Sequence, residues 1–410
     1  MFLRNWNFEP MMKILLRLCI FLFVLSLNAV SAHEPPKEAD STQPSTIPTA
    51  GQELCQQQPA SFKPGLVLEE FVFTNAPFPS CHAATIAEVN GELVCAFFGG
   101  TAERNPDVGI WISHTFSGKW TPVVEIANGT ITPELRYPTW NPVLFLPKGA
   151  ELLLFYKVGP SPTQWWGMMM TSSDGGWNWS KPKTIIGEKG KALIGAVKNK
   201  PIQLSDGTIL APSSREDSGW KVHIEASSDN GKTWTELTGP LNDPNEMSAI
   251  QPTLLTYPNG QIQMLCRSRQ DRILETWSGD GGKNWSPMQP TILPNPNSGI
   301  DGVTLADGRQ LLVYNHSTRS QPAVGHKGRG ILNVALSRDG KNWQAALVLE
   351  YEDQPNSQFS YPSVIQTADG LVHIVYTWHR QRIKHVVLNP EKLQTVPMPD
   401  GQWPKNAYPR

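Results

Sequence analysis

The sequence predicts an all-β chain folded as a six-bladed β-propeller, and three observations support this fold class. An apolar run, a tight turn and a second apolar run recur six times along the chain. A tryptophan-containing turn follows five of these six hairpins. The 15 Trp, 33 Gly and 36 Pro residues do not suit a helical bundle and are typical of short strands joined by many turns.

The six hairpins are recognised by their turns. Asn-Gly and Asp-Gly between apolar runs are the strongest short hairpin signals, because both central residues of a type I′ turn need positive φ. All of the turns but the second, which has Lys-Gly, are of this kind. They recur every 48 to 62 residues, which indicates one repeated unit. The turn glycines are Gly91, Gly149, Gly207, Gly260, Gly308 and Gly370.

The tryptophan turn is the second repeated element. Ser172–Trp179, Ser227–Trp234 and Ser278–Trp285 fit the pattern S-x-D-x-G-x-[TN]-W. Ser337–Trp343 is one residue shorter, and Ser113–Trp120 keeps only the ends of the pattern. In such a turn the Asp carboxylate accepts backbone N–H bonds while the Trp packs between neighbouring sheets, so we interpret it as structural.

The blades follow from these two elements. A hairpin and the two strands around the tryptophan turn make a four-stranded blade, and six such units make a ring. The sixth unit lacks the turn, so a strand within Gly65–Phe73 is predicted to complete its outer edge and close the ring. The propeller domain is expected to span residues 61–395, with a C-terminal tail at 396–410. No blade can bury its apolar faces alone, so we expect one folding unit.

The N-terminal region is predicted to be a targeting segment. Residues 1–32, with the start of translation at Met1, Met11 or Met12, contain basic residues, an apolar run and a small-residue cleavage site. Residues 33–60 lack apolar periodicity and are rich in Pro, Ser, Thr and Gln, which indicates a disordered linker. We therefore expect an exported protein, periplasmic or secreted, with no stable membrane insertion after cleavage.

The composition argues against several classes of function. A formal net charge of -1 gives no general attraction to nucleic acid, and the basic residues are dispersed. No Cys or His pair has zinc spacing, and no glycine-rich phosphate loop opens a helix, so no metal and no cofactor are predicted. An even number of cysteines in an exported protein permits disulfides, although Cys95 and Cys266 lie in strand-like runs and fit buried free thiols equally well. The four that follow the cleavage site are Cys55, Cys81, Cys95 and Cys266.

Polar side chains gather where the hairpins begin and end. In a propeller these positions share one face, which we call the mouth, and the hairpin turns lie on the other face. The hairpin starts, counted back from each turn, are His82, Trp140, Lys198, Gln251, Gly299 and Tyr361. The hairpin ends include Lys157, Arg215, Arg267, Asn315 and His316. Such a collection predicts a binding or catalytic site at the mouth.

The tryptophan turns resemble the Asp-box, or BNR repeat, of the sialidase superfamily, and the resemblance covers about 330 residues. Members of that family hold a substrate carboxylate with three arginines, use a Tyr assisted by a Glu as nucleophile, and carry an acid/base Asp on a first-blade loop. Tyr361 matches the nucleophile, and Arg267 and Arg329 match the second and third arginines. Asp107 lies on the first long mouth-side loop, where the family has its acid/base. The resemblance thus implies a hydrolase acting on a sialic acid or a related acidic sugar, with an acidic glycan as partner.

Two positions depart from the family pattern. His82 stands where the family has its first arginine, and Gln251 stands where the family has the Glu that activates the tyrosine. An amide cannot take the phenol proton. Glu225 and Glu246 are the nearby carboxylates considered as substitutes. Four residues are candidates for the missing positive charge: Arg104, Lys157, Lys198 and Arg215.

These departures leave two other functions open. A polysaccharide lyase would use His82 or Tyr361 to abstract the proton next to a uronate carboxylate, with Arg267 and Gln251 stabilising the resulting charge. A non-catalytic glycan-binding propeller would use the same mouth. We expect His82 within hydrogen-bond reach of Tyr361 in a lyase, and Tyr361 and Asp107 apart in a lectin. Asp107 also fits a simple turn former. The secondary candidates for sugar contacts are Trp140, Trp165, Trp166, Asn315, His316, His379 and Arg380.

Overall fold

The computed structural model describes residues 63–319 and 323–404. The predicted signal peptide and linker, together with Cys55, lie outside these residues. The described part consists of short antiparallel strands and three single turns of 3₁₀ helix. No helix within it is long and apolar enough to cross a membrane.

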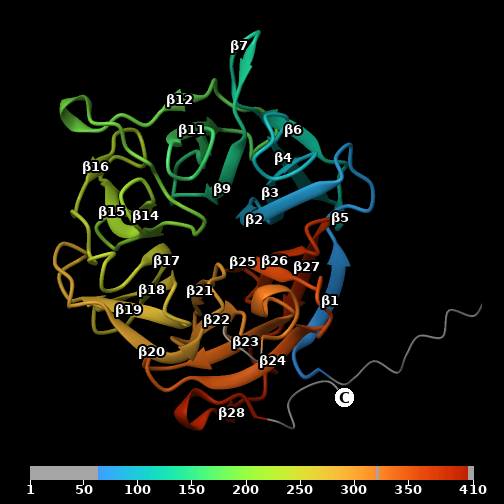
Figure 1. Ribbon diagram of the computed structural model, residues 1–410, viewed down its shortest axis with the longest axis vertical. Coiled ribbons are helices and arrows are strands. Elements are labelled where there is room, and N and C mark those ends of the chain that lie inside the picture. The colour runs from blue at the N-terminus through green and yellow to red at the C-terminus, as the bar shows by residue number, and fades with distance from the viewer. Residues whose placement is uncertain (1–62, 320–322, 405–410) are drawn as a thin grey trace, which may run out of the picture. The chain divides into compact units, whose positions relative to one another are not determined.

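Six antiparallel sheets surround a central axis, as the six hairpins predicted (Figure 1). Blade 1 contains β2 (Ser80–Val89), β3 (Glu92–Gly100), β4 (Gly109–Phe116), β5 (Lys119–Trp120) and β6 (Val124–Ala127). Blade 2 contains β9 (Thr139–Phe145), β10 (Leu152–Val158), β11 (Trp166–Ser172) and β12 (Lys183–Thr184). Blade 3 contains β13 (Ile202–Gln203), β14 (Ile209–Arg215), β15 (Lys221–Ser227) and β16 (Thr235–Glu236).

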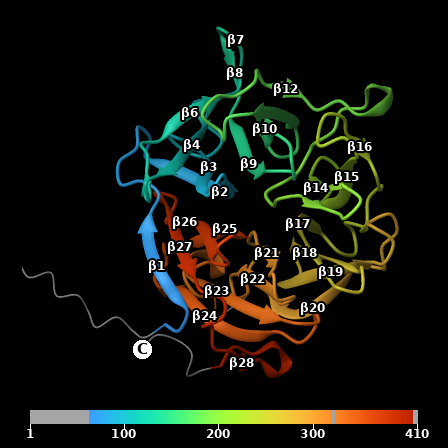
Figure 2. The same ribbon diagram turned by 180° about the vertical axis from the view of Figure 1, so that it is seen from behind.

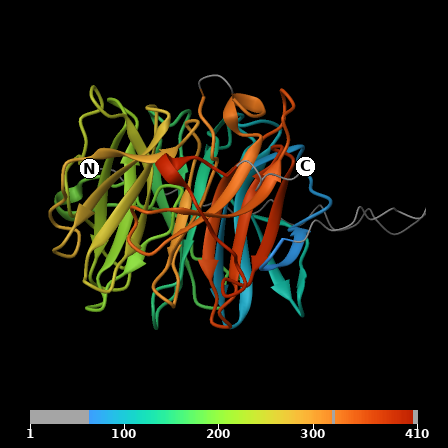
Figure 3. The same cartoon turned by 90° about the horizontal axis from the view of Figure 1, so that it is seen from below.

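The second half of the ring repeats this plan. Blade 4 contains β17 (Ala249–Thr256), β18 (Ile262–Ser268), β19 (Arg272–Ser278) and β20 (Gln289–Pro294). Blade 5 contains β21 (Asp301–Thr304), β22 (Gln310–Tyr314), β23 (Ile331–Ser337), β24 (Gln344–Tyr351) and β28 (Val396–Pro397). Blade 6 contains β25 (Phe359–Gln366), β26 (Val372–Trp378), β27 (Arg382–Leu388) and β1 (Leu66–Phe71). Seen edge-on, the strands run between the two faces of the ring (Figure 3).

The first strand in sequence closes the ring. β1 pairs antiparallel with β27, from Leu66 opposite Leu388 to Phe71 opposite Lys384. The outer edge of the last blade therefore comes from the other end of the domain, which is the closure predicted for Gly65–Phe73. Part of the segment expected to be a tail also joins a sheet, because β28 pairs with β24. A short hairpin of β7 (Thr130–Thr132) and β8 (Leu135–Arg136) projects from the ring between blades 1 and 2 (Figure 2).

The tryptophan turns have the structural role that the sequence indicated. Asp280 accepts hydrogen bonds from the backbone and side-chain amides of Asn284, at 2.9 and 2.6 Å. The Asn284 backbone amide is the main cause that lowers the pKa of Asp280 to about 2. Trp234, 3% exposed, packs edge-on against Phe155 of the preceding blade, with ring centroids 5.3 Å apart. Each turn therefore ties its own backbone together and joins two blades.

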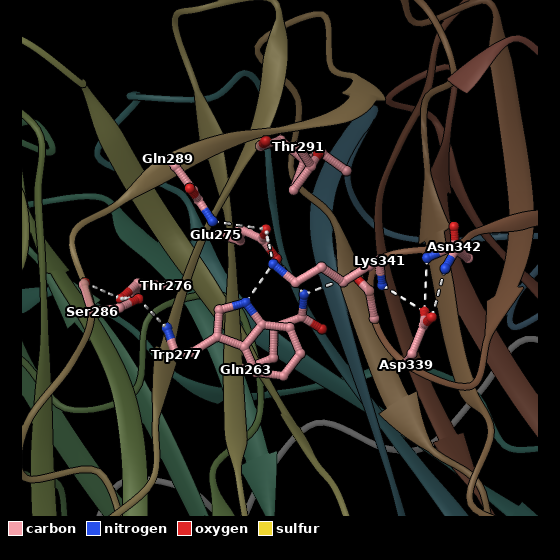
Figure 4. Close-up of polar contacts among 12 residues, drawn as sticks. Gln263, Glu275, Thr276, Trp277, Ser286, Gln289, Thr291, Asp339, Lys341 and Asn342 are labelled. Carbon is pink, nitrogen blue, oxygen red and sulfur yellow. Dashed lines mark hydrogen bonds and ion pairs between the residues drawn. The ribbon is translucent and has the colours of Figure 1, made fainter. Parts of the chain in front are cut away.

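A buried carboxylate joins blades 4 and 5 beside the tryptophan turn of blade 5 (Figure 4). Glu275 is 5% exposed and accepts hydrogen bonds from Gln263 Nε2 at 2.6 Å and Trp277 Nε1 at 3.0 Å. Lys341, from the turn of the next blade, lies 3.3 Å away and packs over the Trp277 ring. Gln289 supplies a longer bond at 3.4 Å. The charge is therefore buried only with a full set of donors around it.

The three cysteines in the described part, Cys81, Cys95 and Cys266, are free and buried. Burial raises the pKa of each thiol far above its usual value. Of the two states that the sequence left open for them, the structure has the free thiol.

Candidate functional site

A cavity of about 540 Å³ opens at the mouth of the ring. Its size lies within the usual range for small-molecule sites. The starts of four inner strands contribute His82, Trp140, Gln251 and Tyr361, and the end of β18 contributes Arg267. The mouth-side loops supply the rest of the lining: Glu103, Arg104, Pro162, Thr163, Trp165, Glu216, Gly219, Trp220 and Arg269, beside Asn141 and Ile250 of the strands.

Irregular backbone at the strand starts brings these side chains to the cavity. Residues at the mouth ends of five inner strands or the loops before them have positive φ: Ala83, Asn141, Lys198, Gln251 and Tyr361. At four of these places the strand pairing also shifts register, which marks a β-bulge. A bulge breaks the alternation of side chains and re-aims them, and bulges are common beside active sites. A β-bulge at the mouth end of the inner strand therefore recurs in four of the blades.

Tyr361 lies at the centre of a hydrogen-bond network. Its Oη accepts from Arg267 Nη1 at 2.5 Å and from Gln251 Nε2 at 3.2 Å. The other end of the Gln251 amide, Oε1, accepts from the same Arg267 nitrogen at 3.1 Å. A guanidinium has no acceptor, so it holds the amide with its oxygen toward Arg267 and its NH₂ toward Tyr361. Gln251 is therefore a donor to the phenol and cannot take its proton.

Two arginines flank the Tyr361 ring. The Arg267 guanidinium carbon lies 5.6 Å from its centroid and that of Arg329 lies 5.9 Å away. Asn297 joins them, because its Oδ1 accepts from Arg267 Nε at 2.8 Å and its carbonyl accepts from Arg329 Nη2 at 2.9 Å. Burial, together with the nearby charge of Arg267, lowers the pKa of Arg329 to about 10. Arg329 Nε is buried without a partner in the described part.

His82 packs beside Tyr361 and not in hydrogen-bond contact with it. The two ring centroids are 4.0 Å apart, and His82 Nδ1 lies 2.9 Å from Thr377 Oγ1. Thr377 Oγ1 also accepts from the Ala83 amide, and because a hydroxyl has one donor hydrogen and two acceptor lone pairs, either tautomer of His82 satisfies this contact. Burial, followed by the charges of Arg380, Arg329 and Arg267, holds the pKa of His82 well below its usual value. His82 is thus a neutral imidazole.

Two carboxylates line the cavity. Glu103 forms an ion pair with Arg380 at 2.5 Å. Glu216 follows β14 and makes no ion pair within the described residues, and burial raises the pKa of its carboxyl. The lining also contains three guanidinium groups, those of Arg104, Arg267 and Arg269. The lining therefore carries a positive excess, which suits an anionic ligand.

Aromatic walls stand on two sides of the cavity. Trp140 and Trp165 meet edge-on with centroids 6.0 Å apart, and the Trp140 indole donates to the Gly159 carbonyl at 2.8 Å. On another side, the Trp220 ring lies under the guanidinium groups of Arg269 and Arg267, at 4.1 and 5.2 Å. Flat apolar faces beside charged groups suit a sugar ring that carries an acidic substituent.

Comparison with known proteins identifies the family. The family model of the BNR repeat-like domain matches residues 91–374. The chain belongs to this family. The BNR chain is similar to the anhydrosialidase of Macrobdella decora, with 24% identity over 268 residues that cover 56% of this chain and 32% of the relative. It therefore spans about a third of that relative's length.

Solved structures share the fold. The BNR propeller is similar to the Hadza microbial sialidase Hz136, with a TM-score of 0.66, 16% identity and coverage of 80% of this chain and 69% of that one. A protein of unknown function from Dyadobacter fermentans gives a TM-score of 0.61 and 18% identity, over 80% of this chain and 99% of that one. Together with the family match, these neighbours support membership of the sialidase and BNR-repeat superfamily.

Several predicted site residues of the BNR propeller lie away from the cavity lining. Asp107 is exposed, and its two carboxylate oxygens accept from the Thr101 amide and hydroxyl at 2.8 and 2.9 Å. This is the turn-forming role that was its alternative. Arg215 lies beside Glu236 at 3.8 Å, and Trp166 meets Tyr137 edge-on at 5.9 Å.

Other candidates are buried in structural contacts. Lys157 donates to the Ala196 carbonyl, and Lys198 donates to the Ile300 and Pro362 carbonyls. Burial lowers the pKa of each ammonium to about 7. Asn315 donates to two backbone carbonyls, at 2.6 and 2.7 Å. These three side chains hold neighbouring strands together beneath the mouth.

The remaining histidines and carboxylates are also engaged elsewhere. His316 Nδ1 lies 2.6 Å from the Tyr314 hydroxyl, and His379 lies 3.3 Å from Glu352. Glu225 is buried and accepts the Ile194 and Gly195 amides, at 2.9 and 2.8 Å. Glu246 lies at a different surface pocket. Neither Glu225 nor Glu246 therefore takes the role of the family's activating glutamate, whose position Gln251 occupies in this chain.

Sequence reasoning missed four lining residues that carry chemistry: Glu103, Glu216, Trp220 and Arg269. Glu103, Glu216 and Arg269 lie just past the end of a strand that the hairpins predicted, and Trp220 lies immediately before β15. The signal available was position near a hairpin end: Glu103 lies in "TAERN", Glu216 and Trp220 in "SREDSGW", and Arg269 in "CRSRQ". Within residues 63–319 and 323–404 no group of three or more His, Cys, Asp or Glu side chains is arranged to hold a metal ion.

Proposed function

We propose that this BNR propeller is an exported glycosidase that releases a carboxylate-bearing sugar, a sialic acid or a close relative, from the end of a glycan. Tyr361 is the nucleophile, and Arg267 and Arg329 bind the sugar carboxylate. The observation that carries this proposal is the 2.5 Å hydrogen bond from Arg267 Nη1 to Tyr361 Oη, inside a cavity with a positive excess. The predicted signal peptide of residues 1–32 would deliver this activity outside the cytoplasm.

The pairing of a phenol with arginines suits this chemistry. An anomeric carbon that bears a carboxylate repels a carboxylate nucleophile, whereas a phenol approaches without that repulsion. Arginine matches the planar carboxylate with two parallel hydrogen bonds. The two N–H groups on Tyr361 Oη stabilise charge on that oxygen when the covalent bond later breaks.

The lyase alternative has less support. It requires a base near the substrate, and we expected His82 to bond to Tyr361 in that case. His82 instead bonds to Thr377. The other alternative to the glycosidase is a glycan-binding propeller without catalytic activity. The separation of Asp107 from the cavity lining favours it, because a lectin needs no acid at that position.

A product assay separates these functions. The purified protein would be incubated with sialylated and uronate-containing oligosaccharides, and the products weighed by mass spectrometry, with Tyr361→Phe as the control variant. Release of a free acidic sugar that the variant abolishes supports the glycosidase. An unsaturated product absorbing in the ultraviolet would establish the lyase. Glycan binding without any product would leave the lectin.

A further inference from the structure

The glycosidase mechanism needs a proton donor, and the structure offers few. An acid must protonate the leaving oxygen as the glycosidic bond breaks, and glycosidases use a carboxyl group for this step. The carboxyl groups in the cavity lining are those of Glu103 and Glu216. Asp107, the position expected from the family, has both oxygens bonded to Thr101 and lies outside the lining.

Of the two lining carboxylates, Glu103 is already engaged in an ion pair. Its Oε2 lies 2.5 Å from Arg380 Nη1, and Arg380 is itself placed by Gln358. A guanidinium therefore already occupies the Glu103 carboxylate with a charge-assisted hydrogen bond. The Glu216 carboxyl has no such partner in the described part, and burial raises its pKa, with the Trp220 indole and the charges of Arg267 and Arg269 acting in the opposite direction.

The position of Glu216 in the ring also fits an acid. Tyr361 belongs to blade 6, and Glu216 lies in the loop between β14 and β15 of blade 3. The blades follow one another around the axis in chain order, so the third and the sixth lie on opposite sides of the central axis (Figure 1). The Arg267 guanidinium contacts the rings of both Trp220 and Tyr361. The loop that carries Glu216 and Trp220 is therefore separated from the phenol by this one side chain. A nucleophile and an acid on opposite sides of the sugar is the arrangement of a displacement at the anomeric carbon.

We propose that Glu216 is the general acid and base of the reaction. This inference rests on the proposed glycosidase function. In the first step Tyr361 Oη bonds to the anomeric carbon and the bond to the leaving oxygen breaks. The Glu216 proton passes to the leaving oxygen and the phenol proton to solvent. In the second step water attacks the anomeric carbon, Glu216 takes one water proton, and the bond to Tyr361 breaks with return of a proton to the phenol.

The test compares two leaving groups. The full-length protein and Glu216→Gln would be assayed on the 4-nitrophenyl α-glycoside of N-acetylneuraminic acid and on sialyllactose. The 4-nitrophenyl group leaves as 4-nitrophenolate and needs no proton, whereas the lactose oxygen of sialyllactose must be protonated as it leaves. We expect Glu216→Gln to lose ~100-fold or more in kcat/KM on sialyllactose. On the nitrophenyl substrate it should retain a rapid burst and accumulate a sugar adduct on Tyr361, detected by mass spectrometry.

Two matched variants sharpen the result. Asp217→Asn removes an exposed neighbouring charge, and Glu103→Gln removes the other carboxylate of the lining; neither should show the burst with adduct. Equal losses on both substrates in Glu216→Gln, or the burst signature in Glu103→Gln, would overturn the role of Glu216 while the glycosidase function stands. A folded wild type that releases sugar from neither substrate and from no other acidic glycoside would overturn both.

Discussion

The Glu275 junction between blades 4 and 5 gives a quantitative test of how the ring is held together (Figure 4). Replacing Glu275 by alanine removes a buried charge that accepts from Gln263, Trp277 and Lys341, at 2.6, 3.0 and 3.3 Å. A hydrogen bond to a charged group contributes about 1.5–3 kcal/mol, so losing the bonds from Gln263 and Trp277 costs roughly 3–6 kcal/mol of unfolding free energy. Gln263 Nε2 keeps a second acceptor, the Gly340 carbonyl at 3.0 Å, so the lower half of that range is expected.

The matched variant is Lys341→Ala. Its side chain is 55% exposed, so the ion pair with Glu275 is screened by water and contributes about 0–1 kcal/mol. The contact with the Trp277 ring adds about 0.5–1 kcal/mol. Urea denaturation followed by tryptophan fluorescence would measure both variants. Equal losses of stability, or a loss below about 1 kcal/mol for Glu275→Ala, would refute the reasoning that the buried carboxylate, and not the visible ion pair, stabilises this junction.

Three further predictions concern other parts of the molecule. Asp280 has a lowered pKa, so its contribution to stability is present above about pH 4 and is lost as the pH falls toward 2; acid unfolding of Asp280→Asn should therefore show a weaker pH dependence over that range. Trp234→Ala should lose about 3–5 kcal/mol in urea denaturation, and Trp177→Ala, 56% exposed, less than about 1 kcal/mol; similar losses would contradict the packing argument. Because the pKa of His82 is held well below its usual value, the pH profile of activity or glycan binding from about pH 5 to 8 should keep its shape in His82→Gln, and a limb that vanishes in the variant would show that His82 titrates there.

The candidate site was predictable where the hairpin repeat fixes a residue's place. Counting from each turn glycine brought His82, Gln251 and Tyr361 to the mouth, because a strand has a fixed rise per residue and all hairpins start on one face. The same count also selected Lys157 and Lys198, whose ammonium groups the structure buries against backbone carbonyls. Distance along a strand sets the height of a residue in the ring, but a bulge decides which way its side chain points.

By itself, the sequence determined the repeat, the number of blades and the strand that closes the ring, because turn chemistry and apolar alternation are local properties of the chain. Only the tertiary structure decided which charges meet. Glu216, Trp220 and Arg269 lie on loops whose paths have no periodicity, and Asp107 turns back on Thr101. The hydrogen-bond direction of Gln251 depended on Arg267 from the neighbouring strand. Long-range contacts of this kind leave no pattern in a single sequence, since each partner is set by the packing of blades far apart along the chain.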